Sequence, residues 1–315
     1  MIPDAALLIV AGLILLWFGS DFVVTAARNI AQHLKMSPLF VGLVITAAGT
    51  SLPEISNNVM TGIANLTRES SGIGLGNVLG ANMANITLLL GGIALFLPFS
   101  LRKNNLSRDG GFMIVALCLA FLAAADLRIS RLEAASLLIA YLVYLVYIIR
   151  HERIVLPAPG PGKKEHPLVD AGLLTAGFAM VLGGGYLVVN SGVSLAQGYA
   201  VPNYVVGVFL GIGTTLPELS VSLRAALRKY HALFLGNLIG SNITNSLLAL
   251  GGGAVISGYA VRREVLLFDF PYLLAVSAII FLMLFRYSKL GRREGIMLLL
   301  FYLLFIYLNV VVGRG

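Results

Sequence analysis

Long apolar stretches, separated by short polar ones, recur along the whole chain. A transmembrane helix needs about 20 mainly apolar residues, and stretches of roughly that length occur ten times. We therefore predict ten membrane-spanning helices, which makes the chain an all-α membrane protein. The predicted helices cover approximately residues 5–27, 39–64, 71–98, 110–126, 132–149, 168–196, 203–224, 232–257, 265–285 and 294–312.

Composition agrees with this prediction and excludes several classes of protein. Of the 315 residues, 58% are hydrophobic and 11% are charged, whereas a soluble domain has about 25% charged residues. A soluble enzyme, a nucleic-acid-binding protein and a disordered scaffold are therefore poor fits. The one cysteine, Cys118, cannot form a disulfide framework or a cysteine metal site within the chain.

The net charge of +8 comes from Lys and Arg residues that lie in loops and at helix ends. Membrane proteins concentrate these residues in their cytoplasmic segments. With the N-terminus outside, 16 of the 22 basic residues are cytoplasmic, so we predict that both termini lie outside. A cytoplasmic linker, 150–167, is rich in proline, glycine and charge and separates five helices in 1–149 from five in 168–315.

The two halves share two motifs in the same order. Residues 38–54 (PLFVGLVITAAGTSLPE) match residues 202–218 (PNYVVGVFLGIGTTLPE) at an offset of 164. A second motif, GNVLGANMANITLLLGG from Gly76, matches GNLIGSNITNSLLALGG from Gly236 at an offset of 160. Because five is an odd number of helices, the second half must enter the membrane in the opposite orientation. Such inverted repeats are typical of secondary transporters, which bind substrate near the membrane midplane where the repeats meet.

Two glutamates, Glu54 and Glu218, occupy equivalent positions inside predicted membrane helices. An ionisable side chain there costs about 2.5–3.5 kcal/mol on insertion scales, so its presence needs a reason. Each glutamate directly follows a proline, which frees a backbone carbonyl in the preceding turn. The alternative is that the prolines only kink the helices and the glutamates are neutral structural acids. Two such glutamates at matched positions favour ion binding.

Hydroxyl groups lie next to both glutamates in the sequence. Thr50 precedes Glu54 by four residues, as Thr214 precedes Glu218. In a continuous helix, residues four apart share one face. The following hydroxyls, Ser51 and Thr215, can supply further oxygen atoms.

The second motif adds amides. Asn85 and Asn245 are equivalent, and Ser241 precedes Asn245 by four residues, where the first half has Ala81. Carboxylate, amide and hydroxyl oxygens suit hard cations such as Na⁺, Ca²⁺ or Mg²⁺. Four further asparagines have the alternative role of bonding one helix to another: Asn77, Asn82, Asn237 and Asn242.

These motifs resemble those of the cation/Ca²⁺ antiporter superfamily, specifically the prokaryotic sodium/calcium exchangers. Both α-repeats of that family carry G-[TS]-[ST]-x-P-E followed by G-N-x-x-G-S-N, and the resemblance covers nearly the whole chain. It implies a ten-helix fold in which helices 2, 3, 7 and 8 form a core. The first and sixth helices would slide against that core during alternating access.

The resemblance also implies the cation ligands. By motif match these are Thr50, Ser51, Glu54, Asn85, Thr214, Thr215, Glu218, Ser241 and Asn245, with the backbones of Ala47 and Gly211. Two positions depart from the family pattern, because Asn245 stands where an aspartate is typical and Ala81 replaces a serine of a sodium position. The site then carries at most two negative charges, which one Ca²⁺, two Na⁺ or two H⁺ would neutralise. We expect divalent binding to persist and a three-Na⁺ stoichiometry to be impaired.

We therefore predict a secondary active antiporter that exchanges Ca²⁺ for Na⁺ at a midplane site. The alternative is an exchanger of H⁺ for Ca²⁺ or another divalent cation, with weak or no Na⁺ coupling. A channel or receptor is disfavoured by the inverted repeat, and an enzyme by the lack of any catalytic constellation. We expect no cofactor, no nucleic-acid partner and no required oligomer. The expected location is the plasma membrane, in contact with lipid, of a prokaryotic cell.

Overall fold

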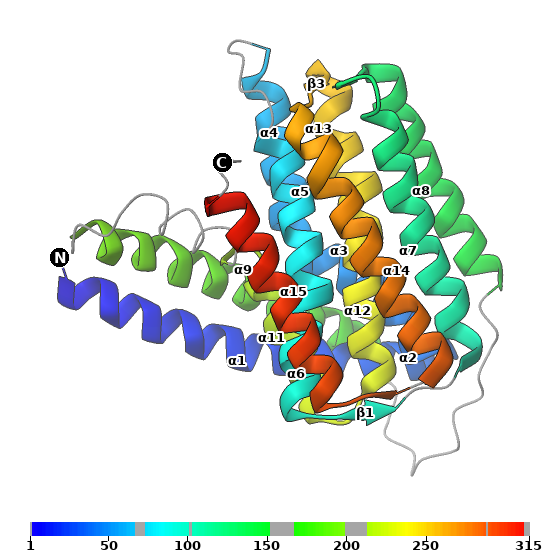
Figure 1. Cartoon of the computed structure of the whole chain (residues 1–315). Coiled ribbons are helices and arrows are strands. Elements are labelled where there is room, and N and C mark those ends of the chain that lie inside the picture. Colours follow the sequence, from blue (N-terminus) through cyan, green and yellow to red (C-terminus); the bar gives the residue numbers. More distant parts are fainter. Residues whose placement is uncertain are drawn as a thin grey trace. The chain divides into compact units, whose positions relative to one another are not determined.

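The computed structural model describes residues 2–66, 73–100, 103–151, 167–198, 213–287 and 289–311. These residues are almost entirely helical (Figure 1). Helix is found in every one of the ten predicted apolar stretches, although the stretch at 203–224 is described only from Gly213 onward. Most of the linker 150–167 lies outside the described residues.

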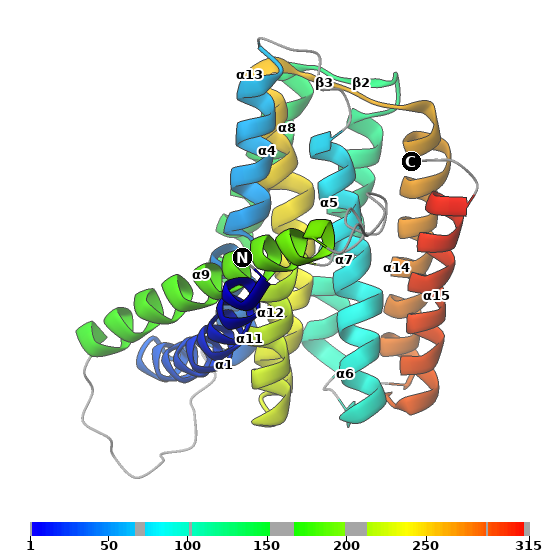
Figure 2. The same cartoon turned by 90° about the vertical axis from the view of Figure 1, so that its left-hand side faces the viewer.

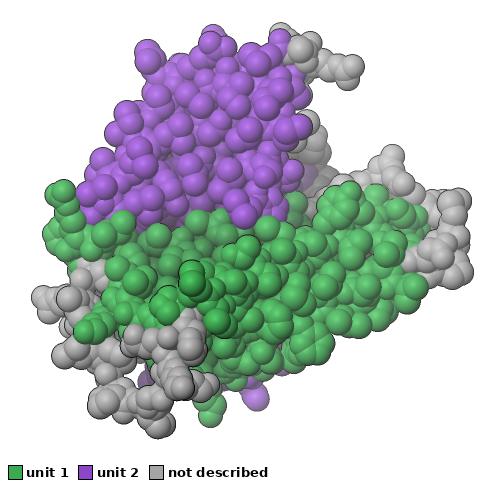
Figure 3. Space-filling model, turned by 180° about the vertical axis from the view of Figure 1, so that it is seen from behind, with its two compact units in different colours: residues 1–50, 148–238 green, residues 51–147, 239–315 purple. Residues whose placement is uncertain are grey.

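The chain forms two compact units, each of which draws on both halves of the sequence (Figure 3). Unit 1 comprises Met1–Thr50 and Ile148–Leu238, and unit 2 comprises Ser51–Tyr147 and Ile239–Gly315. The elements of unit 1 are α1 (Ile2–His33), α2 (Pro38–Val41), the π-helical turn η1 (Gly42–Thr46), α3 (Ala47–Thr50), α9 (Pro167–Gly198) and α11 (Leu216–Leu227).

Unit 2 contains the remaining helices, three further π-helical turns and four short strands. In chain order these are α4 (Leu52–Ala64), α5 (Ile73–Met83), η2 (Ala84–Leu89), α6 (Leu90–Phe96), β1 (Phe99–Ser100), α7 (Lys103–Ala123), β2 (Arg128–Ile129), η3 (Asn245–Ala249), α13 (Leu250–Ser257), β3 (Tyr259–Ala260), η4 (Val265–Asp269), α14 (Phe270–Tyr287), β4 (Lys289–Leu290) and α15 (Arg292–Val311). Two helices, α8 (Arg131–His151) and α12 (His231–Thr244), contribute residues to both units.

The protein is a helical membrane protein. Within the described ranges, six helical spans are long and apolar enough to cross a bilayer, and the interrupted helix Pro38–Ala64 would be a seventh. Apolar side chains on their outer faces are exposed, as at Leu7, Leu132 and Leu168, which suits contact with lipid. Ten crossings, the inverted orientation of the halves and the outside position of both termini stay predictions.

In unit 1, α1 and α9 lie side by side and antiparallel (Figure 1). Their backbones approach at two glycine pairs, Gly12 with Gly184 and Gly19 with Gly177. A Cβ added at Gly12 would come 2.7 Å from the carbonyl oxygen of Gly184. An offset of 165 residues relates Gly12 to Gly177 and Gly19 to Gly184, so the two contacts are equivalent. The first and sixth predicted helices therefore form one symmetric pair.

In unit 2, two antiparallel strand pairs connect elements of the two halves. Phe99 of β1 is opposite Leu290 of β4, and Tyr259 of β3 is opposite Ile129 of β2. Phe99 and Tyr259 are 160 residues apart, and Ile129 and Leu290 are 161 apart. Each half thus supplies one strand to each pair, in the same register. A two-fold relation between the halves predicts this exchange; their division into domains at 1–149 and 168–315 stays a prediction.

Close helix contacts bring the second motif of each half into the interior of unit 2. Helix α4 packs on α13, where a Cβ added at Gly62 would come 2.3 Å from the carbonyl oxygen of Gly253. Helix α4 also packs on α5 and η3, and α5 on η2 and η3. Figure 2 shows α4 beside α13 from a second direction. The second-motif asparagines of unit 2, Asn82, Asn85, Asn242 and Asn245, are buried among these helices.

Candidate cation site

The two GT-[ST]-LPE motifs interrupt their helices at the same position. Ser51 has φ −82° and ψ 8°, and Thr215 has φ −89° and ψ 5°, so both leave the helical region toward the bridge region. New helices, α4 and α11, begin at the next residue and carry proline in their first turn, where its missing N–H is tolerated. The expected proline distortion is confirmed. Because the helix is interrupted at Ser51, Thr50 and Glu54 lie on two different helices, α3 and α4, and not on one face of a continuous helix as expected.

Glu54 and Glu218 each lie in the first turn of one of these new helices. Both side chains are fully buried. Backbone N–H groups at a helix N-terminus carry partial positive charge and stabilise a carboxylate there. The pattern Ser/Thr-x-x-Glu is also that of a capping box. However, neither Ser51 nor Thr215 caps its helix with its side chain, so a complete capping box does not account for the two acids.

The amides of the second motif lie on π-helical turns. Asn85 is in η2 and Asn245 begins η3, and both are fully buried. A π turn contains one residue more than an α turn, which changes the direction of the side chains around it, and such turns are frequent at functional sites. Sequence reasoning missed these turns because no residue type marks them. These two π turns recur at matched positions in the two halves, with Asn85 and Asn245 in them 160 residues apart.

Unit 1 holds five of the predicted ligands: Ala47, Thr50, Thr214, Thr215 and Glu218. All but the half-buried Thr214 are buried. Gly211, the equivalent of Ala47, lies outside the described residues.

A buried hydrogen-bond chain runs through unit 1 from one half of the sequence to the other. Thr50 Oγ1 donates to the carbonyl oxygen of Ala47 (3.4 Å) and to Asn237 Oδ1 (3.3 Å). Asn237 Nδ2 donates to Ser222 Oγ (3.0 Å), and Ser222 lies one turn after Glu218 on α11. Helix α3 also packs against α11. The structure thus brings Thr50 of the first motif together with the helix that carries Glu218.

Unit 2 holds the other five described ligands: Ser51, Glu54, Asn85, Ser241 and Asn245. All five side chains are fully buried. Asn85 Nδ2 donates to Asn242 Oδ1 (3.4 Å), while the Oδ1 atoms of Asn85 and Asn245 have no hydrogen-bond partner in the described part of the chain. Two amide oxygens are therefore open to a cation.

Three of the four asparagines considered as links between helices do make such links. Asn82 Nδ2 donates to Ser246 Oγ (2.9 Å), and Asn242 Nδ2 donates to Met113 Sδ (3.5 Å). Asn237 Nδ2 donates to Ser222 Oγ of α11 (3.0 Å). The alternative, interhelical role is thus confirmed for Asn82, Asn237 and Asn242.

A family model described as "Sodium/calcium exchanger protein" matches residues 5–150 and 169–311. The chain belongs to the sodium/calcium exchanger family. Members of this family exchange Ca²⁺ and Na⁺ as secondary transporters, without a cofactor, and are not enzymes. The resemblance seen in the two motifs is therefore confirmed across the chain of this exchanger.

Known proteins similar to this exchanger cover it almost completely. Sodium/calcium exchanger MaX1 of Methanosarcina acetivorans is 30% identical over 97% of this chain and 98% of its own. Inner membrane protein YrbG of Escherichia coli is 29% identical over 93% of each chain. A solved structure of the sodium-calcium exchanger NCX_Mj has a TM-score of 0.85 and 29% identity, covering 97% of this chain and 99% of that one. The exchanger therefore shares its fold with NCX_Mj.

Proposed function

We propose that this protein exchanges Ca²⁺ for Na⁺ across the membrane by alternating access at a single buried cation site. The observation that carries the proposal is the matched burial of Glu54 and Glu218, each in the first turn of an interrupted helix. Both ions would compete for these two carboxylates, and their occupancy would permit the α1–α9 pair to move. The name of the relative MaX1 supports Na⁺ as the coupling ion.

The proposed ligands are the residues of both motifs. They are Ala47 and Gly211 through their backbones and Thr50, Ser51, Glu54, Asn85, Thr214, Thr215, Glu218, Ser241 and Asn245 through side chains. Oxygen donors of these kinds match Ca²⁺ and Na⁺. One Ca²⁺ or two Na⁺ would balance the two carboxylates, so we expect electroneutral exchange.

The proposed membrane arrangement is ten helices in two inverted five-helix domains, 1–149 and 168–315, with 150–167 as the cytoplasmic linker and both termini outside. The basic residues of the loops support this orientation. The name of the relative YrbG supports placement in the cell membrane. Because one chain contains both motif pairs, we expect a monomer in a lipid bilayer to form the whole site, without an oligomer.

Flux measurements with separated gradients test the proposal. In proteoliposomes, ⁴⁵Ca²⁺ uptake is expected to follow an imposed outward Na⁺ gradient and to vanish in Glu54→Gln. Glu133→Gln is the matched control, because the Glu133 carboxylate caps the start of α8 by accepting a hydrogen bond from Ser130 N (2.8 Å to Oε2). The side-chain oxygen of glutamine can accept the same bond. Uptake in Glu54→Gln equal to that of the control would refute the site.

The same experiment separates the two coupling ions. A pH gradient imposed without Na⁺ is expected to drive little uptake. If it drives uptake while a Na⁺ gradient does not, the protein is an H⁺/Ca²⁺ exchanger. Ala81→Ser would then have no effect on Na⁺ dependence, whereas in a Na⁺-coupled exchanger the added hydroxyl is expected to lower the half-saturating Na⁺ concentration.

A further inference from the structure

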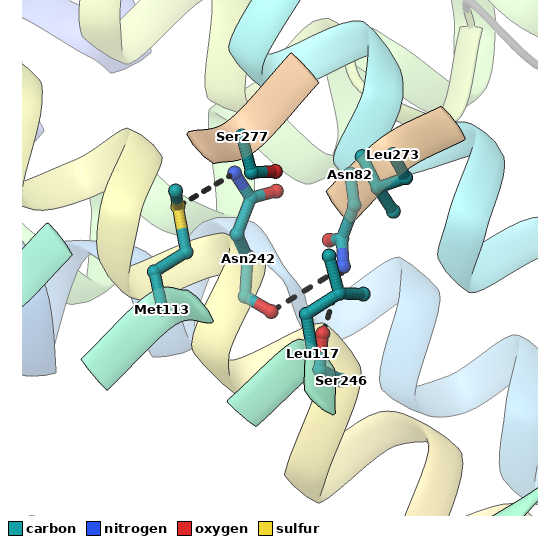
Figure 4. Close-up of a pocket in the computed structure, with 7 residues that line it drawn as sticks. All are labelled: Asn82, Met113, Leu117, Asn242, Ser246, Leu273 and Ser277. Carbon is teal, nitrogen blue, oxygen red and sulfur yellow. Dashed lines mark hydrogen bonds between the residues drawn. The ribbon is translucent and has the colours of Figure 1, made fainter. Parts of the chain in front are cut away.

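A cluster of buried polar side chains lies in unit 2 beside the π turns. They line a cavity of about 10 Å³ together with three apolar side chains (Figure 4), which is room for about one water molecule. The polar members are Asn82, Asn242, Ser246 and Ser277, and the apolar ones are Met113, Leu117 and Leu273; they come from α5, α7, α12, η3 and α14. The 160-residue offset relates Asn82 to Asn242, so equivalent asparagines of the two halves line the same cavity.

The Asn242 amide has a defined orientation. Its Nδ2 donates to Met113 Sδ (3.5 Å), and its Oδ1 accepts a hydrogen bond from Asn85 Nδ2 (3.4 Å). The Asn82 amide donates to Ser246 Oγ (2.9 Å) and to the Asn242 backbone carbonyl (3.4 Å), which also holds the two helices together (Figure 4). Asn242 thus presents an acceptor to Asn85 and turns its own donor away.

This contact decides which atom Asn85 offers to a cation. A side-chain amide has one acceptor oxygen and one donor nitrogen, which point in different directions. Because Asn85 Nδ2 is bonded to Asn242, Asn85 Oδ1 points elsewhere, and it has no hydrogen-bond partner among the described residues. A rotated amide would direct N–H groups at the cation and repel it.

The equivalent bond is missing in the other half. By the repeat, Asn245 Nδ2 would donate to Asn82 Oδ1, but both atoms are buried without a hydrogen-bond partner in the described ranges. The two halves therefore differ in how firmly their amide is oriented. We propose that Asn242 is a positioning residue that holds the Asn85 amide with its oxygen toward the transported cation. This inference rests on the proposed function, in which Asn85 is a ligand.

Three variants of Asn242 test the inference in the full-length protein in proteoliposomes. Asn242→Leu is nearly the same size but offers no acceptor, and we expect the half-saturating Ca²⁺ concentration to rise about 10-fold, within the range for partners that orient metal ligands. Asn242→Asp keeps an acceptor and is expected to restore wild-type affinity within about two-fold. Asn242→Ala opens space for a water that can accept from Asn85, so an intermediate rise of about three-fold is expected. The maximal rate is expected to change less than two-fold.

Asn82→Leu is the matched control, because Asn82 is the repeat equivalent of Asn242, is equally buried and does not bond to Asn85. We expect its half-saturating Ca²⁺ concentration to stay at the wild-type value. Equal shifts in Asn82→Leu and Asn242→Leu would overturn the inference. If Asn242→Leu does not fold, the order Ala above Asp still tests it, and equal values for those two variants would also overturn it.

Asn85→Leu separates failure of this inference from failure of the proposed function. If Asn85→Leu raises the half-saturating Ca²⁺ concentration but Asn242→Leu does not, the positioning role is wrong and the site stands. If neither variant changes it, Asn85 is not a ligand, and both the positioning role and this part of the proposed site are refuted.

Discussion

The close approach of α1 and α9 gives a sharp test of the helix pair predicted to move during transport. Gly183 and Gly184 are neighbours on α9, but only Gly184 faces α1. A Cβ added at Gly184 would come 2.7 Å from the carbonyl oxygen of Gly12 and 2.9 Å from the backbone N of Leu16. A Cβ added at Gly183 meets nothing within 4 Å. Alanine at the two positions therefore probes the same helix with and without the contact.

The expected magnitudes follow from these distances. Replacing glycine by alanine within a helix contributes about 1 kcal/mol in favour of folding at either position. At Gly184 the clashing atoms belong to the backbone of α1, at distances well below the 3.4 Å of ordinary contact. The helices must move apart, and overpacking of this kind costs about 1–3 kcal/mol. Gly184→Ala should thus be about 1–3 kcal/mol less stable than Gly183→Ala.

The measurement is unfolding of the purified protein in mixed micelles of increasing SDS content. The only tryptophan, Trp17, lies on α1, with the Arg224 guanidinium 4.6 Å from the centre of its ring, so its fluorescence reports on that helix. We expect Gly183→Ala to unfold above the wild-type midpoint, because alanine favours the helix. We expect Gly184→Ala at or below the wild-type midpoint, because overpacking offsets or exceeds that gain. Equal midpoints for the two variants would refute the backbone contact between α1 and α9.

Three further changes test other contacts. Asp21 forms partly exposed ion pairs with Arg224 of α11 and with Arg228, the C-cap of that helix. Asp21→Asn should therefore lower the stability of the folded protein by about 0.2–1 kcal/mol per pair at low salt and by less at high salt; no salt dependence would contradict this. Burial raises the pKa of the Tyr259 phenol, which stays protonated and donates to the Asn58 backbone carbonyl (2.7 Å). Tyr259→Phe should lower the free energy of unfolding in SDS by about 1–3 kcal/mol, and an unchanged midpoint would refute the bond. Asn245→Asp adds a third carboxylate and should lower the half-saturating Na⁺ concentration in flux assays; no change would mean that Asn245 is not a ligand.

Much of the fold could be predicted from apolar stretches and repeated motifs. A run of about 20 apolar residues has few alternatives to a helix in lipid, because every backbone polar group must be bonded internally. The prolines before both glutamates indicated a local distortion, since proline removes a backbone donor. That the helices would end at Ser51 and Thr215 was not predicted. Glu54 and Glu218 were identified because charge within a membrane span is costly.

Features that depend on contacts between distant segments could not be predicted. The repeated motif identified Asn85 and Asn245, but no residue type in it marks the π turns on which they lie. The ion pair of Asp21 with Arg224 is another such feature, because it depends on α1 packing against α11. The orientation of the Asn85 amide likewise required knowing that Asn242 lies beside it.

The short strand pairs of unit 2 have a consequence for the halves as separate polypeptides. A single half carries either β1 and β2 or β3 and β4, and neither set pairs with itself. In an isolated half, each strand would expose backbone N–H and C=O groups without the hydrogen bonds that the other half supplies. Two half-length chains related by a two-fold axis would pair all four strands through one self-complementary interface. Co-expressed fragments divided within 150–167 should therefore assemble without a covalent link, because the pairs β1–β4 and β2–β3 join one fragment to the other.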